Sequence, residues 1–170
     1  DQGKFMELLY DLVAGGGYIQ SIVDMRRGLD FAATREDIDT ERIGYVGVSM
    51  GAMMGSVTCS VDERIDAAVL VIGGAMGDTT NEALAGVDGA TFIPLLSPRP
   101  LLMLNGKNDP LVQPAWAKRL FDAAGEPKER KAGECPGDVD QDQVGMRPAG
   151  EADRRGDDQR SEDAAAARPP

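Results

Sequence analysis

The sequence predicts an α/β protein with about three mainly parallel strands, flanked by helices and followed by a disordered C-terminal tail. Three observations lead to this fold class. Short apolar runs at residues 43–48, 65–72 and 100–106 are typical of buried strands. The segments around them have apolar residues at helical spacing. After Gly125 the composition changes abruptly to charged and small residues.

Two amphipathic helices are predicted before the first strand, at residues 4–14 and from about residue 18 to residue 33. Charged side chains occupy the polar side of the second helix. We interpret them as a solvated helix face, in preference to a catalytic group, because such faces are common on surface helices. The residues concerned are Asp24, Arg26, Arg27 and Asp30.

The first apolar run, Ile43 to Val48, is too continuous for a one-sided strand and predicts a strand that is buried on both faces. An uncharged stretch of small residues and Met follows at 51–59 and predicts a helix packed against that strand. The next apolar run begins soon afterwards. A strand, a short helical crossover and a second strand together predict a parallel pair.

The remaining elements complete the α/β pattern. Residues 75–99 have mixed composition and predict a long loop with a short helix or two, placed where a substrate pocket needs variable walls. The third strand follows a Pro98-Arg99-Pro100 turn. A last helix is predicted from about Pro114 to Ala124, with Gly125 as its stop.

These elements define one domain over residues 1–125 and a low-complexity segment over residues 126–170. The second segment contains no aromatic residue, leucine or isoleucine. It cannot bury enough apolar surface to offset the entropy of ordering, so we expect it to be disordered. A shifted reading frame in a GC-rich gene would produce an amino-acid sequence of this composition, and resequencing the coding DNA would test that hypothesis.

Composition excludes several classes of partner. The net charge of −11 argues against nucleic acid and anionic membranes, and no apolar run is as long as a membrane span. Cys59 and Cys135 do not make a disulfide framework, and Cys59 is expected to be a small core residue. The chain has no histidine, so we expect no metal site, and no motif calls for a cofactor. It begins at Asp1 and not at a methionine, which suggests that an N-terminal piece is missing; the cytoplasm is slightly favoured as its location.

The segment Gly47-Val48-Ser49-Met50-Gly51 is a G-x-S-x-G motif at the end of the first strand. This pattern is typical of a nucleophile elbow, in which a serine on a sharp strand-to-helix turn exposes its hydroxyl above a sheet. Gly47 and Gly51 are expected to prevent a clash between the two sides of the turn. The amide of Met50, at the helix start, is expected to donate to a developing oxyanion.

Asp109 follows the third strand at its carboxyl end, where parallel sheets gather functional groups. A catalytic carboxylate is one interpretation of this position. The other is a turn-forming residue in Asn108-Asp109-Pro110, because Asp readily bonds to the backbone of its own turn. The residue pattern alone leaves both open.

Several spaced segments together resemble an α/β-hydrolase. They are the G-x-S-x-G motif, the strand from Ala67 to Ile72, and Pro100-Leu101-Leu102-Met103-Leu104-Asn105-Gly106-Lys107-Asn108-Asp109. The match is most similar to the dienelactone hydrolase and acetyl xylan esterase type, or to prolyl oligopeptidase-like catalytic domains. It covers roughly residues 18–128 and implies a partial α/β-hydrolase fold, with early strands missing upstream of Asp1.

The resemblance implies a serine hydrolase with Ser49 as nucleophile and Asp109 as the acid that orients a histidine. The family's histidine lies in a loop after one further strand. Residues 129–136 are expected to form neither that strand nor that loop, and no histidine is present. We therefore expect an esterase whose activity is impaired in this chain, acting on a small-molecule ester or a short peptide. The alternatives are a serine peptidase, and a non-catalytic fragment that associates with another chain through an exposed sheet edge.

Overall fold

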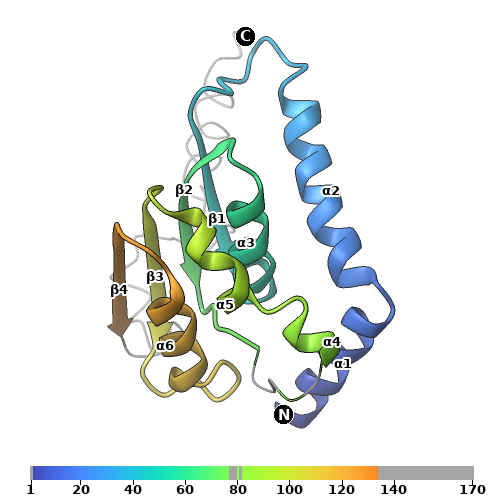
Figure 1. The fold of residues 1–170 in the computed structure, drawn as a ribbon, viewed down its shortest axis with the longest axis vertical. Helices are drawn as coiled ribbons and strands as arrows, with labels where there is room; N and C mark the ends of the chain where they lie inside the picture. Colours follow the sequence, from blue (N-terminus) through green and yellow to red (C-terminus); the bar gives the residue numbers. More distant parts are fainter. Residues whose placement is uncertain (1, 77–79, 81, 134–170) are drawn as a thin grey trace, which may run out of the picture. The chain divides into compact units, whose positions relative to one another are not determined.

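The computed structural model of this chain describes residues 2–76, 80 and 82–133. In this part of the chain, four parallel strands form one sheet, and they follow one another in sequence order (Figure 1). They are β1 (Ile43–Val48), β2 (Ile65–Val71), β3 (Leu101–Gly106) and β4 (Lys128–Gly133). The register pairs Val48 with Val71, and Val71 with Leu104. The carboxyl ends of the strands therefore share one edge, as the predicted parallel sheet requires.

Helices connect and flank these strands. Before the sheet come α1 (Gln2–Ala14) and α2 (Gly17–Ala32), and α3 (Met50–Val61) joins β1 to β2. The long connection to β3 contains α4 (Glu82–Ala85), α5 (Gly89–Phe92) and the 3-10 helix η1 (Ile93–Leu96). Helix α6 (Pro114–Ala123) joins β3 to β4. In the stretches that the structure describes, no helix has the length and apolar character needed to span a membrane.

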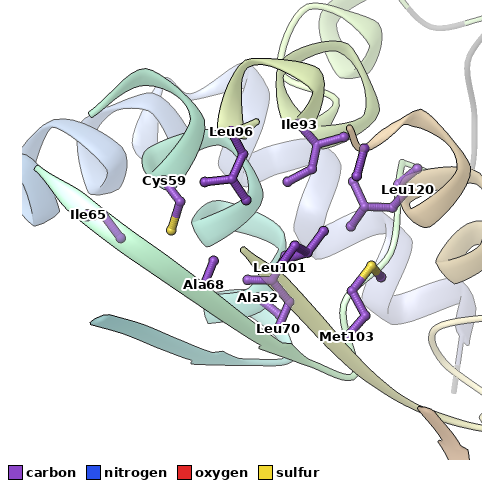
Figure 2. Packing of buried hydrophobic residues seen from close by; sticks show 12 residues of the cluster. Ala52, Cys59, Ile65, Ala68, Leu70, Ile93, Leu96, Leu101, Met103 and Leu120 are labelled. Carbon is purple, nitrogen blue, oxygen red and sulfur yellow. The ribbon is translucent and has the colours of Figure 1, made fainter. Parts of the chain in front are cut away.

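The main core lies between one face of the sheet and the helices α3, α6 and η1. Figure 2 shows its side chains meeting from the two layers. Ala52 and Cys59 of α3 are fully buried, as are Leu70 and Met103 of the strands, within the same cluster. The uncharged residues of α3 allow this helix to lie directly on β1 and β2. Cys59 is a core residue, as predicted.

A second apolar cluster forms where α2 packs on α3 and α1 packs on α2 and α4. Its centre is made of fully buried side chains such as Leu9 and Tyr18. Methionines surround this centre, and flexible thioether side chains suit an interface of irregular shape. Met53 and Met76 are buried in the cluster, and Met6, Met25, Met50 and Met54 pack against it.

The other face of the sheet is less well covered, and here one prediction was wrong. Val46 is 70% exposed and Val48 is 57% exposed, so β1 is not buried on both faces in the part of the chain that the structure describes. Both valines alternate with Tyr45 and Gly47, which face α3. The strand is also at the edge of the described sheet, and only β2 pairs with it. The residues of this apolar run are therefore covered on one face of the strand only.

Strand β4 corrects a second expectation, because residues 128–133 form a strand where the sequence indicated none. It pairs with β3 along its whole length, from Leu101–Lys128 to Gly106–Gly133. Lys128 Nζ donates to the carbonyls of Phe121 (2.9 Å) and Ala124 (2.6 Å) and lies 4.8 Å from the centre of the Phe121 ring. Backbone pairing and these contacts replace the missing apolar pattern. The folded sheet thus extends past residue 125, and the rest of the predicted tail, 134–170, lies outside the described residues.

Arginines converge on Asp62 at the amino-terminal end of β2. Its buried carboxylate accepts from Arg64 (2.7 and 2.8 Å) and from Arg26 (3.0 Å), while Arg99 donates to the Asp62 carbonyl (2.9 Å). The hydrogen bonds from Arg64 are the largest cause that lowers the pKa of Asp62 far below its usual value. Arg64 also pairs with Asp30 (2.7 Å). Arg26 and Asp30 therefore tie α2 to the α3–β2 turn and are not merely a solvated face.

Candidate active site

Ser49 occupies a strained turn between β1 and α3. Its backbone has φ 53° and ψ −115°, although positive φ is unusual for a residue other than glycine. The Ser49 amide donates to the Val71 carbonyl of β2 (2.9 Å), and the Ser49 carbonyl accepts from Ala52 (2.9 Å) and Met53 (3.0 Å). Its side chain makes no capping hydrogen bond to the helix. The turn is held through its backbone, and the partly exposed hydroxyl is not used to hold it.

Met50 is the first residue of α3, directly after Ser49. The first amides of a helix have no acceptor within the helix and carry the positive end of its dipole. The Met50 side chain packs against the second apolar cluster, and Ser49 is partly exposed.

The two glycines of the motif differ in the space that is available for a side chain at their positions. A Cβ on Gly47 would lie 2.5 Å from the Gly51 carbonyl oxygen and 2.7 Å from the Tyr45 ring. A Cβ on Gly51 would meet only the Tyr45 hydroxyl, at an ordinary 3.9 Å. The expected clash is therefore confirmed for Gly47. It is wrong for Gly51, whose backbone approaches Gly47 but whose own Cβ position is open.

Asp109 lies in the loop after β3 and is buried, with 8% exposure. Its Oδ1 accepts from the amides of Leu111 (2.8 Å) and Val112 (2.9 Å). The carboxylate therefore closes its own turn, as predicted by the interpretation of Asp109 as a turn-forming residue. Within the described residues, no hydrogen bond engages its second oxygen, so the turn leaves one acceptor for another group.

Ser49 and Asp109 belong to the same edge of the sheet. They follow β1 and β3, which both pair in parallel with β2. Two strand spacings separate β1 from β3, or about 10 Å between their backbones. The two side chains make no direct hydrogen bond.

The loop after β2 begins between the ends of β1 and β3. Its strained backbone was not predicted from the sequence. Ile72 has φ 55°, which is rarer still for a β-branched residue, and its amide donates to the Leu104 carbonyl (2.7 Å). The Asn105 amide nitrogen donates to the Gly73 carbonyl (2.8 Å). Strained backbone often accompanies functional sites. The adjacent glycines Gly73-Gly74 were the signal that could have indicated this turn.

The described residues contain no group of three or more His, Cys, Asp or Glu side chains that could hold a metal ion. Cys59 lies in the core away from this edge, where burial raises the pKa of its thiol to about 12. Cys135 lies outside the described residues. The carboxyl edge of the sheet offers the Ser49 hydroxyl, the Asp109 carboxylate and backbone amides.

Solved structures with a similar fold include esterases. An acetyl xylan esterase from Paenibacillus sp. R4 matches with a TM-score of 0.60 and 22% identity, over 68% of this chain and 46% of that one. A cold-adapted esterase from an Arctic intertidal metagenomic library matches with a TM-score of 0.58 and 30% identity, over 71% and 52%. The described sheet is part of an α/β-hydrolase fold. The resemblance indicated by the sequence is confirmed at this level.

A sequence match agrees with the α/β-hydrolase fold. The Bacillus subtilis (strain 168) protein described as "Putative hydrolase YtaP" is 40% identical over 48 residues, which cover 28% of this chain and 16% of that protein. No model of a known protein family matches the chain. The chain spans about half the length of the two esterases. Together, these likenesses support a hydrolase of the α/β type.

Proposed function

We propose that this α/β-hydrolase chain derives from a serine hydrolase that cleaves carboxylic esters through an acyl-enzyme. Ser49 is the nucleophile and Asp109 is the acid that orients a general base. The observation that carries the proposal is the strained Ser49 turn, whose hydroxyl is free of the helix cap at the sheet edge that also holds Asp109. Strain of this kind has a stability cost, and a functional role accounts for its presence.

In the proposed reaction, the Ser49 oxygen attacks the ester carbonyl carbon and forms a new C–O bond. The carbonyl oxygen becomes an oxyanion, which accepts a hydrogen bond from the Met50 amide. A histidine takes the serine proton and passes it to the leaving alcohol as the ester C–O bond breaks. Water, activated by the same base, then hydrolyses the acyl-enzyme. The acid holds the imidazole in the correct tautomer.

The base of this scheme is missing, because the sequence contains no histidine. Without it, Ser49 is an ordinary alcohol. Loss of a triad member reduces turnover by roughly 10⁴- to 10⁶-fold. We therefore propose that this chain, which lacks a histidine, is nearly inactive. We also propose that added imidazole, which has the same ring as a histidine side chain, restores part of its activity.

The test is turnover of p-nitrophenyl acetate by the full chain and by Ser49→Ala, each with and without added imidazole. Imidazole also hydrolyses this ester in solution, and the Ser49→Ala protein measures that background. We expect little Ser49-dependent turnover without imidazole and a clear excess with it. A fluorophosphonate probe should likewise label Ser49 slowly, and faster with imidazole. Equal rates for the two proteins under both conditions would refute the proposal.

Esters are proposed over peptides because the two solved relatives above carry the name esterase. A serine peptidase of the prolyl oligopeptidase type is the alternative within enzymes. Parallel assays with p-nitrophenyl acetate and a short peptide p-nitroanilide, under the same imidazole concentration, separate the two. Ser49-dependent release from the anilide at a rate similar to the ester would favour the peptidase.

A second candidate function is that of a non-catalytic module that associates with another chain. The exposed Val46 and Val48 side chains, on a strand whose outer edge has no partner in the described sheet, favour it. Sedimentation of the full chain at increasing concentration measures self-association. Val46→Lys should prevent it, with Val61→Lys on α3 as the control for added charge. A monomer at all concentrations would remove the support for self-association.

A further inference from the structure

The ring of Tyr45 lies against three glycines that surround the Ser49 turn. A Cβ placed on Gly47 would lie 2.7 Å from the Tyr45 Cε1 atom, and a Cβ on Gly55 would lie 2.3 Å from the same atom. A Cβ on Gly51 would lie 3.9 Å from the hydroxyl. Real Cβ atoms do not approach other atoms within 3 Å, so the ring can occupy this position only because residues 47 and 55 are glycine.

The spacing of these residues explains how they meet. Tyr45 and Gly47 are two residues apart in β1, so they face the same side of the sheet. Gly51 and Gly55 are four residues apart in α3, so they share one helix face. The ring therefore fills the contact between β1 and the first turns of α3, next to Gly47 and Gly51, which lie on either side of Ser49 in the sequence (Figure 1 shows the two elements side by side).

The Tyr45 hydroxyl adds a directional contact. It donates to the carbonyl of Gly51 at 2.7 Å and lies 3.7 Å from the sulfur of Met25. Partial burial raises the pKa of Tyr45 above its ordinary value. Gly51 is two residues after Ser49, so this bond holds the start of α3 at a defined distance from the strand.

We propose that Tyr45 is a positioning residue for the Ser49 hydroxyl and the Met50 amide. Its ring sets the spacing between β1 and α3, and its hydroxyl sets the rotation of the first helical turn. The functional part of this inference rests on the proposed hydrolase activity, but the geometric part does not. Tyr45 does not touch the reacting atoms, and it acts through Gly47, Gly51 and Gly55.

The test compares Tyr45→Phe with the full chain in imidazole-assisted labelling of Ser49 by a fluorophosphonate probe. Phe keeps the ring and removes only the hydrogen bond. Loss of one such bond predicts labelling about 3- to 10-fold slower. Ile65→Val, a core change distant from the turn, provides a control for general destabilisation and should label at the normal rate. Tyr45→Phe at the normal rate would overturn the role of the hydroxyl.

A size exchange tests the role of the ring. Gly55→Ala should slow labelling in the natural chain, because the new methyl group displaces the ring. In a Tyr45→Leu background the same substitution should have little effect, because the smaller side chain leaves room. Equal effects of Gly55→Ala in both backgrounds would show that the ring and this glycine are not coupled.

The failure of this inference can be distinguished from failure of the proposed function. If Ser49 is not labelled even with imidazole, the hydrolase proposal fails, and amide NMR shifts then decide the role of Tyr45. In Tyr45→Phe the amide signals of Ser49 and Met50 should move, while those of β3 should stay. Unchanged signals for Ser49 and Met50 would overturn the positioning role, whatever the enzymatic result.

Discussion

The Ser49 amide donates a 2.9 Å hydrogen bond to the carbonyl of Val71, the last residue of β2. Ser49 is already outside β1, yet this bond keeps it attached to the neighbouring strand. On the other side of the turn, the Ser49 carbonyl accepts hydrogen bonds from the first amides of α3, from Ala52 and Met53. Movement of the turn away from the sheet would break the bond to Val71. The positive φ of Ser49 is therefore held in place by backbone contacts on both sides.

The two motif glycines should respond differently to the same substitution. Gly47→Ala drives a methyl group against the Gly51 carbonyl and should destabilise the chain by about 1–3 kcal/mol. Gly51→Ala adds a methyl group in α3 that makes only an ordinary van der Waals contact with the Tyr45 hydroxyl, and it should stabilise by up to about 1 kcal/mol. Urea denaturation of both variants measures the difference. Similar losses for the two would contradict the geometry of the turn.

Removing the strain at Ser49 should increase stability. Positive φ costs about 1–3 kcal/mol for a residue with a Cβ, and glycine avoids this cost at an entropic penalty of about 0.5–1 kcal/mol. Ser49→Gly should therefore be more stable than Ser49→Ala by about 1 kcal/mol, as judged by thermal unfolding. Neither variant should be labelled by a fluorophosphonate. An Ala variant as stable as the Gly variant would argue against backbone strain at this position.

The arginines around Asp62 should make stability depend on pH. Because they lower the folded-state pKa of Asp62, its contribution is complete above the unfolded-state pKa, about 4, and is lost as the pH falls toward the lower folded value. Asp62→Asn should cost about 2–3 kcal/mol at pH 7. The difference between the two proteins should shrink below about pH 4 in urea titrations. A difference that does not change with pH would assign the effect to packing.

Two tyrosines provide a matched pair of hydroxyl deletions. The Tyr18 hydroxyl is fully buried without a hydrogen-bond partner in the described part of the chain, while the Tyr45 hydroxyl bonds to Gly51. Removal of an unpaired buried hydroxyl should stabilise, and removal of a bonded one should destabilise, each by about 1 kcal/mol. Tyr18→Phe should thus raise the midpoint of thermal unfolding and Tyr45→Phe should lower it. Equal shifts would contradict the assigned hydrogen bonds.

Periodicity was sufficient for most elements. The predicted apolar runs became β1, β2 and β3, and the last predicted helix became α6, with bounds that shifted by only a residue or two. These segments have strong patterns because each buries one face in a core. Strand β4 escaped prediction, since it opens with four consecutive charged residues, is stabilised by backbone pairing with β3 and carries no apolar pattern.

The sequence by itself determined the order of the strands and main helices up to α6, the G-x-S-x-G turn and the location of Asp109 after a buried strand, because these depend on local pattern. The tertiary structure decided the rest. It brought the ends of β1 and β3 to one edge, left no room for a Cβ at Gly47 but room for one at Gly51, and set the Tyr45 ring against Gly47 and Gly55. These contacts depend on which atoms from distant segments come within contact range, and the local pattern of a sequence does not specify those distances.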